Sequence, residues 1–459
     1  MEKNKKDLTT GPVWKTLLLF ALPIIFSAIL QDLYNVADKI VVGRFAADGK
    51  LALAAVGAVT PALAILVDFF SGLSLGINVI CANYRGAKKV NELRSAMHTA
   101  LVLALLCGIF VMALGIGLAW PMLDFLKTPD TIKDLSHTYM CIYFAGAPFL
   151  LVYNSGAGIL LSNGDTKRPM IILTCSGLVN VALNLLLVVI CGMGVEGVAL
   201  GTVVAQLVSA VWVLWILFNP KEDYKLTLKE LRVNKKDALA LAKIALPSAI
   251  NNTAFDFSNF FMQAAVNTLG DVVIAGCTAA SSIGNLTYKF PAGFYSACVS
   301  VSGQCYGARK FKRIDKVAIT GIILSVTGVA LLASVITLFR EQALAVFNSD
   351  PKVIEGGMAK LMVLSWGYVV YCIQGNISGC LHGLKRNTAT TAINLIFVVG
   401  TRLPWALLIF PMKPSAPLLF LSYPLSWLLC GIAQTIFFLH VRKKLWTEAS
   451  AKPAQIESL

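Results

Sequence analysis

Apolar segments of roughly 20 to 30 residues recur about a dozen times along this chain. A helix of about 20 apolar residues crosses the hydrocarbon core of a bilayer, and only helices and closed barrels satisfy their backbone groups there. Hydrophobic residues make up 57% of the 459 residues and charged residues only 14%, unlike a soluble domain. We therefore expect an all-α integral membrane protein with twelve transmembrane helices. The predicted spans are residues 13–41, 51–82, 94–120, 132–162, 168–191, 195–219, 238–267, 272–305, 313–339, 352–382, 387–412 and 416–441.

The net charge of +15 comes mostly from lysines and arginines in short connections between these segments. The basic residues concentrate before the first span, in every second loop and after the last span. By the positive-inside rule this asymmetry places both termini in the cytoplasm, which requires an even number of spans. Basic loops then serve membrane topology and contact with anionic lipids, and we expect no nucleic-acid partner.

The two halves of the chain resemble each other. Residues 21–23 and 245–247 both read Ala-Leu-Pro, and at this offset Asp32 aligns with Asp256. Six spans in each half give both halves the same orientation, so we predict two six-helix lobes related by a pseudo-two-fold axis along the membrane normal, with a cavity between them. The predicted domains are an N-lobe (1–219), a cytoplasmic linker (220–237), a C-lobe (238–442) and a cytoplasmic tail (443–459).

The first span carries a polar stripe. At 100° per residue, Gln31, Tyr34, Asn35 and Asp38 fall on one face of an otherwise apolar helix. A charged side chain inside a membrane costs at least ~2.5 kcal/mol, so it is a functional candidate. Asp38 is suited to exchange a proton or a monovalent cation; the alternative is a static carboxylate in a salt bridge.

Other ionisable residues lie inside predicted spans. Asp68 and Asp256 are either functional or form polar contacts between helices. Arg402 and Lys289 are expected to act mainly as counter-ions for these carboxylates. Prolines within the spans, Pro23 and Pro247 among them, mark candidate hinges or serve packing alone.

Enzyme motifs do not occur in the sequence. It has no Gly-x-x-x-x-Gly-Lys-Ser/Thr loop, no Gly-x-Ser-x-Gly elbow and no His-Glu-x-x-His motif, so neither ATP hydrolysis nor intramembrane hydrolysis is supported. The eleven cysteines are scattered and the four histidines lie far apart, so we predict no metal centre. A non-enzymatic transporter driven by an ion gradient is the best interpretation, with no cofactor beyond a transported proton or sodium ion.

Several segments together carry a family resemblance. They are LYNVADKIVVGR at 33–44, AAVG at 54–57, GLSLG at 72–76, RGA at 85–87, GVEGVA at 194–199, QCYGA at 304–308 and SYPLSW at 422–427. In this order and spacing they resemble the MATE (multidrug and toxic compound extrusion) transporters, nearer the DinF-like bacterial branch. The resemblance implies two six-helix lobes that form a V. It also implies export of amphipathic, often cationic compounds in exchange for protons or sodium.

The resemblance also implies particular sites. Related transporters bind a cation in the N-lobe with an Asp of the first helix, an Asn and an Asp of the fifth, and a Thr of the sixth. Asp38, Asn180 and Thr202 match, whereas Asn184 stands where those relatives carry Asp, which leaves the choice of ion open. Asn154 falls on a family cavity position, and Asp256 lies near an acidic position of NorM-like relatives. The expected substrate cavity therefore includes Gln31, Tyr34, Asn35, Asn154, Asp68, Asp256 and Arg402.

A rival interpretation within the same superfamily is a flippase for lipid-linked oligosaccharides or lipid II. A cavity dominated by Arg402, Lys289 and Lys39 would favour it, because the phosphates of such lipids require basic side chains. An intramembrane enzyme or a receptor would need a catalytic pair or a soluble ligand domain, and neither is apparent. The expected setting is the inner, plasma membrane of a prokaryote, where the protein works as a monomer on small amphipathic substrates among membrane lipids.

Overall fold

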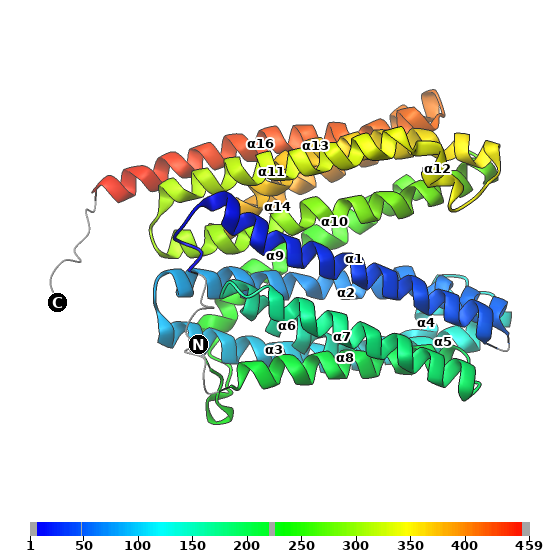
Figure 1. Ribbon diagram of the computed structural model, residues 1–459, viewed down its shortest axis with the longest axis horizontal. Helices are drawn as coiled ribbons and strands as arrows, with labels where there is room; N and C mark the ends of the chain where they lie inside the picture. Colours follow the sequence, from blue (N-terminus) through cyan, green and yellow to red (C-terminus); the bar gives the residue numbers. More distant parts are fainter. Residues whose placement is uncertain (1–6, 47, 220–224, 452–459) are drawn as a thin grey trace. The chain divides into compact units, whose positions relative to one another are not determined.

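The computed structural model describes residues 7–46, 48–219 and 225–451, which are almost entirely helical and contain no strand. Long helical segments occur in these residues at every predicted span (Figure 1). Eight are individually long and apolar enough to cross a membrane, and α5 and α6, which meet at 43°, pass the same test only when taken together as one bent span. The all-helical membrane architecture predicted from hydropathy is confirmed.

The chain folds into two compact units, each considered by itself. The first comprises residues 26–81 and 89–249, and the second comprises residues 7–25, 82–88 and those from 250 onward. Helices α1 (Val13–Phe45), α2 (Gly49–Gly86) and α9 (Lys235–Asn267) contribute to both units. In α1 and in α9 the boundary falls just after an internal proline, Pro23 and Pro247 respectively. Because proline removes one backbone hydrogen bond, these are sites where a helix bends easily. The predicted lobe and linker bounds stay a prediction.

The first unit surrounds an apolar core that includes Val59, Leu123 and Phe144. Helix α3 packs on α6, α6 on α8, and α7 on α8. Gly108 permits the close approach of α3 to α6, because a Cβ there would collide with the backbone of Pro148. The remaining elements of this unit are α3 (Val90–Gly117), α4 (Ala119–Phe125), α5 (Asp130–Ala145), α6 (Ala147–Ser162), α7 (Lys167–Asn184), the π-helix η1 (Leu185–Ile190), α8 (Val195–Leu217) and the 3-10 helix η2 (Leu228–Glu230).

In the second unit α13 packs against α10, α11 and α16, and Figure 1 shows α11, α13 and α16 side by side. Gly276 of α10 and Gly357 of α13 face each other so closely that a Cβ on either would meet backbone. The elements are α10 (Asp271–Gly307), α11 (Phe311–Leu338), α12 (Arg340–Ala345), α13 (Pro351–Gly383), α14 (Asn387–Asn394), the π-helix η3 (Leu395–Val399), α15 (Gly400–Pro404), the π-helix η4 (Trp405–Ile409), the 3-10 helix η5 (Phe410–Met412) and α16 (Ala416–Ala451).

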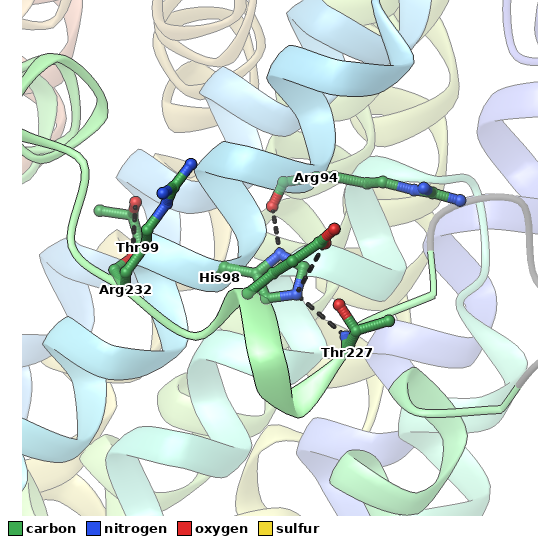
Figure 2. Close-up of polar contacts among 6 residues, drawn as sticks. Arg94, His98, Thr99, Thr227 and Arg232 are labelled. Carbon is green, nitrogen blue, oxygen red and sulfur yellow. Dashed lines mark hydrogen bonds and ion pairs between the residues drawn. The ribbon is translucent and has the colours of Figure 1, made fainter.

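The linker between the halves is docked onto α3 (Figure 2). The buried His98 ring lies between the carbonyl of Arg94, 2.7 Å from Nδ1, and the amide of Thr227, which donates to Nε2 at 3.0 Å. These contacts require the neutral tautomer with its proton on Nδ1. Thr99 adds a contact to the carbonyl of Arg232. The linker is therefore an ordered element where it follows residue 225.

The chain before α1 is also anchored, within the second unit. Lys310 donates to the carbonyl and hydroxyl of Thr9 at 3.0 Å each, and Arg313 donates to three backbone carbonyls, those of residues 8, 10 and 11. Burial opposes ionisation of Asp7, but hydrogen bonds from the side chain and backbone of Thr9, with Lys310 and Arg313 nearby, hold the pKa of Asp7 below its ordinary value. The ionised Asp7 thus stabilises this segment.

Candidate cation-coupling site

A cluster of polar side chains in the first unit brings together all four residues expected to form a cation site. Asp38 projects from α1, Asn180 and Asn184 from α7, and Thr202 from α8. Asn184 Nδ2 donates to Asp38 Oδ1 at 2.5 Å. Because a carboxylate oxygen accepts and cannot donate, Asn180 also turns its nitrogen toward Asp38 Oδ1, at 2.8 Å, while its oxygen accepts from the backbone N–H of Thr202 at 3.3 Å.

The carboxylate is held by neutral groups. Within the residues that the structure describes, Asp38 forms no ion pair, and Lys39 beside it points to another side of α1, where it is exposed. Two amide donors stabilise an ionised carboxylate without cancelling its charge. This arrangement differs from a static salt bridge, the alternative that the sequence had left open.

The backbone around the cluster has two special features. Asn184 is the last residue of α7, and the π-helix η1 begins at the next residue. Such π-helical turns occur frequently at functional sites. On the opposite side Gly201 of α8 lies against Asn184 so closely that a Cβ at position 201 would collide with Asn184 Oδ1. The local fold therefore holds the Asn184 amide against Asp38 by using the smallest residue.

One atom of the cluster lacks a partner. Asn184 is fully buried, and its Oδ1 has no hydrogen-bond partner in the described part of the chain. A buried unsatisfied amide oxygen is costly and indicates either strain or a second state in which it is used. Rotation of the Asn184 amide would present this oxygen to Asp38.

The remaining expected cavity residues of the first unit lie at different places. Tyr34 donates from its hydroxyl to the carbonyl of Thr174 at 3.2 Å, next to the cluster. Gln31 and Asn35 are exposed on α1. The backbone carbonyl of Asn154 accepts from Ser74 at 2.8 Å. The side chain of Asp68 lies outside the described residues. Among the described side chains of this set, Tyr34 contacts α7, the helix that carries Asn180 and Asn184.

Arg402 is buried in the second unit, with 1% of its surface exposed. Its guanidinium carbon lies 4.1, 5.1 and 5.3 Å from the ring centres of Tyr423, Phe255 and Trp427. Nε donates to Ser426 at 3.1 Å, Nη1 reaches Asn259 at 3.4 Å, and Nη2 has no partner among the described residues.

The expectation that Arg402 balances a carboxylate is therefore wrong for the described residues, where it forms no ion pair. Aromatic ring faces stabilise the cation instead. Asp256 lies in the middle of α9, directly after Phe255 and one turn before Asn259, and it is half-buried.

A second polar cluster, in the second unit, was not predicted. Asn394 Oδ1 accepts from Gln374, Gln434 and Cys430 at 3.2, 2.8 and 3.0 Å, and its Nδ2 donates to Asn251 at 2.9 Å. Like Asn184, Asn394 ends an α-helix that continues as a π-helix. All members are neutral, and only the spacing of Asn and Gln within apolar spans could have indicated them. Within the described residues, no three His, Cys, Asp or Glu side chains gather as metal ligands would.

Comparisons with known proteins agree with one another. The sequence profile of the family described as MatE matches residues 23–186 and 247–408. The Bacillus subtilis protein named "Probable multidrug resistance protein YoeA" is 26% identical, with 88% of this chain and 90% of that protein covered. The Shewanella oneidensis protein named "FAD transporter" is 25% identical, with 94% and 95% covered. The solved structure titled "Outward-facing conformation of a multidrug resistance MATE family transporter of the MOP superfamily" has the same fold, with a TM-score of 0.89, 21% identity, and 97% and 99% of the two chains covered.

Proposed function

The chain belongs to the MatE family of membrane transporters, and from that premise we propose that it is a proton-coupled antiporter that exports small amphipathic organic compounds, mostly cationic. The observation that carries the proposal is Asp38, a carboxylate inside an apolar helix with two amide donors and no ion pair among the described residues. A carboxylate kept without a counter-ion attracts a proton or a cation. The proposed setting is the plasma membrane of a prokaryote, with both termini cytoplasmic and a monomer as the working unit.

Geometry favours a proton over sodium as the coupling ion. A sodium ion needs several oxygen ligands, and in the arrangement of the structure both asparagines direct nitrogen toward Asp38, so sodium would require both amides to rotate, whereas a proton requires one. Protonation of Asp38 instead converts an acceptor into a donor. When the Asn184 amide rotates, its unpartnered Oδ1 can accept a hydrogen bond from the carboxylic O–H of Asp38. The two charge states of Asp38 would thus have two different hydrogen-bond arrangements.

These two arrangements provide a switch for transport. Ionised Asp38 accepts from α7 and attracts a cationic substrate, whereas neutral Asp38 loses that attraction. The change occurs on α1, the helix that contains Pro23, where bending is easiest. We propose that proton uptake at Asp38 and bending of α1 together release the substrate to the outside.

The test uses purified protein in liposomes loaded with ethidium. When a proton gradient is imposed with no sodium present, wild-type protein should exchange ethidium for protons. Asp38→Asn should lower the rate of this ethidium transport at least tenfold. Asp124→Asn is the matched control, since it removes the same charge from an exposed carboxylate of α4. An Asp38→Asn rate equal to that of the control would remove Asp38 from the mechanism. Transport that needs sodium at a fixed pH would replace the proton by sodium.

A second candidate function follows from Arg402. A buried guanidinium with three aromatic neighbours and one unpartnered nitrogen suits a flat anionic group, such as the phosphate and ring system of a nucleotide. One relative is named "FAD transporter", and a flippase would also handle phosphates. Export of FAD by the wild-type protein, lost in Arg402→Gln but kept in the exposed Arg340→Gln, would support an anionic substrate. Absence of FAD export alongside ethidium export would exclude it.

A further inference from the structure

Two adjoining hollows lie in the second unit, where α11 begins and α16 ends. The larger, of about 510 Å³, is lined by five cationic side chains, those of Arg309, Lys310, Lys312, Arg313 and Lys316. The smaller, of about 330 Å³, shares the last two and extends along the start of α1. No carboxylate lines either hollow in the described part of the chain.

Most of this positive charge is not neutralised by the side chains that the structure describes. Lys310 and Arg313 hold the segment before α1, where Asp7 lies nearby. Asp315, also on this part of α11, accepts from Arg442 at 3.0 Å. Arg309, Lys312 and Lys316 form no ion pair with any described residue. The larger hollow therefore presents three cations that have no counter-ion among the described residues.

Two tryptophans border these hollows. Trp446 lines the larger one, 5.8 Å from Lys312 Nζ, and Trp14 lines the smaller one with more than half of its surface exposed. Trp446 lies at the end of an apolar helical span, and the span of α11 begins beside it. Tryptophan is enriched at membrane–water interfaces. The two tryptophans therefore indicate that the hollows lie at the level of lipid headgroups.

We propose that these hollows bind the phosphate-bearing headgroup of an anionic phospholipid from the cytoplasmic leaflet. The cations without an ion-pair partner in the described part of the chain attract the phosphate, and the tryptophans suit the boundary between headgroup and acyl chains. Ile319 of α11 is 60% exposed and lines the smaller hollow, which gives the acyl chains an apolar surface next to the charged groups. None of the residues of the Asp38 cluster lines these hollows, so the proposal does not depend on the coupling ion.

Fluorescence of Trp446 tests this proposal on the full-length protein. The protein is placed in phosphatidylcholine vesicles that contain a small fraction of brominated phosphatidylglycerol or, in parallel, of brominated phosphatidylcholine. Because the chain has eight tryptophans, the fluorescence of Trp446 is obtained as the difference between the wild-type protein and Trp446→Phe. Brominated phosphatidylglycerol should quench it at lower mole fractions than brominated phosphatidylcholine does, because the anionic lipid accumulates at the hollow.

Three double variants locate the effect. Removing both lysines in Lys312→Gln/Lys316→Gln should lower the preference for phosphatidylglycerol at least tenfold, at about fivefold per basic side chain. Lys312→Arg/Lys316→Arg should keep it, which separates charge from folding. Lys235→Gln/Lys236→Gln removes two exposed charges at the start of α9 and should also keep it.

Three results would overturn the proposal: an unchanged preference in Lys312→Gln/Lys316→Gln, an equal loss in the α9 control, or loss of the wild-type preference on adding millimolar inorganic phosphate. The first would show that the hollow does not select the lipid. The second would show a general surface charge effect, and the third would show a site for free phosphate.

Discussion

Gly201→Ala is a sensitive test of the Asp38 cluster, because it adds one methyl group and no charge. A Cβ at this position would lie about 1 Å inside the 3.0 Å that real Cβ contacts keep from Asn184 Oδ1. The Asn184 amide must therefore move away by about 1 Å. A shift of this size would disturb the length and the angle of its 2.5 Å hydrogen bond to Asp38, because a good N–H···O bond tolerates only a few tenths of an ångström.

The size of the effect follows from the bond that is lost. A hydrogen bond to a charged group contributes about 1.5 to 3 kcal/mol. Since 1.4 kcal/mol is a factor of ten, proton-driven ethidium transport in liposomes should fall by about 10- to 100-fold. Ala is about 1 kcal/mol more favourable than Gly in a helix, so α8 itself should not be weakened by the change. Gly57→Ala is the matched control, since a Cβ there meets nothing within 4 Å.

A double-mutant cycle with Asn184→Ala identifies the route of the effect. If Gly201→Ala acts through the Asn184 amide, it should cost little further activity once that amide has been removed. Transport by Gly201→Ala within twofold of the Gly57→Ala control would refute the reasoning. An undiminished cost in the Asn184→Ala background would show that the methyl group acts on another neighbour.

Two further predictions concern the segments docked outside the spans. Asp7→Asn should lower the thermal unfolding temperature at neutral pH but have little effect in acid. The pKa of Asp7 is lower in the folded protein than in the unfolded chain. The ionised Asp7 therefore stabilises the fold above the unfolded-state pKa, and this stabilisation is lost as the pH falls through the folded-state pKa. Thermal scans at a series of pH values check this, and an equal destabilisation at all pH values would contradict it. His98→Leu leaves the backbone amide of Thr227 without its acceptor, which should lower the stability of the docked linker by about 1 to 3 kcal/mol. The linker should then be cleaved faster in limited proteolysis, and an unchanged digestion pattern would show that the contact is dispensable.

The sequence predicted the features that the membrane imposes most strongly. Every predicted span corresponds to a helical segment, because a bilayer demands about 20 apolar residues per crossing. The stripe containing Tyr34 and Asp38 was visible because helical periodicity alone places residues on one face. The meeting of Asp38 with Asn180, Asn184 and Thr202 depended on the family resemblance, since hydropathy does not say which helices pack together.

The sequence did not predict features that depend on tertiary neighbours. The π-helix after Asn184 and the Gly201 approach have no single-residue signature. The sequence shows the charge of Arg402, so a carboxylate partner was expected. It does not show that aromatic rings of α9 and α16 surround the guanidinium. His98 likewise gave no sign of its role until the linker was seen to return to α3.

The two units differ in the charge of their polar clusters, although each cluster includes an Asn immediately before a π-helix. Asn184 faces a carboxylate, whereas Asn394 faces Gln374, Gln434 and Asn251, which are neutral. A neutral network does not change its charge with pH, so it can position helices but cannot couple to a proton gradient. The Asn394 cluster therefore cannot take part in the proposed coupling, and we assign one proton per cycle to Asp38 of the first unit. A measured stoichiometry of two protons per ethidium would contradict this assignment and would direct attention to a second carboxylate, such as Asp256 of α9.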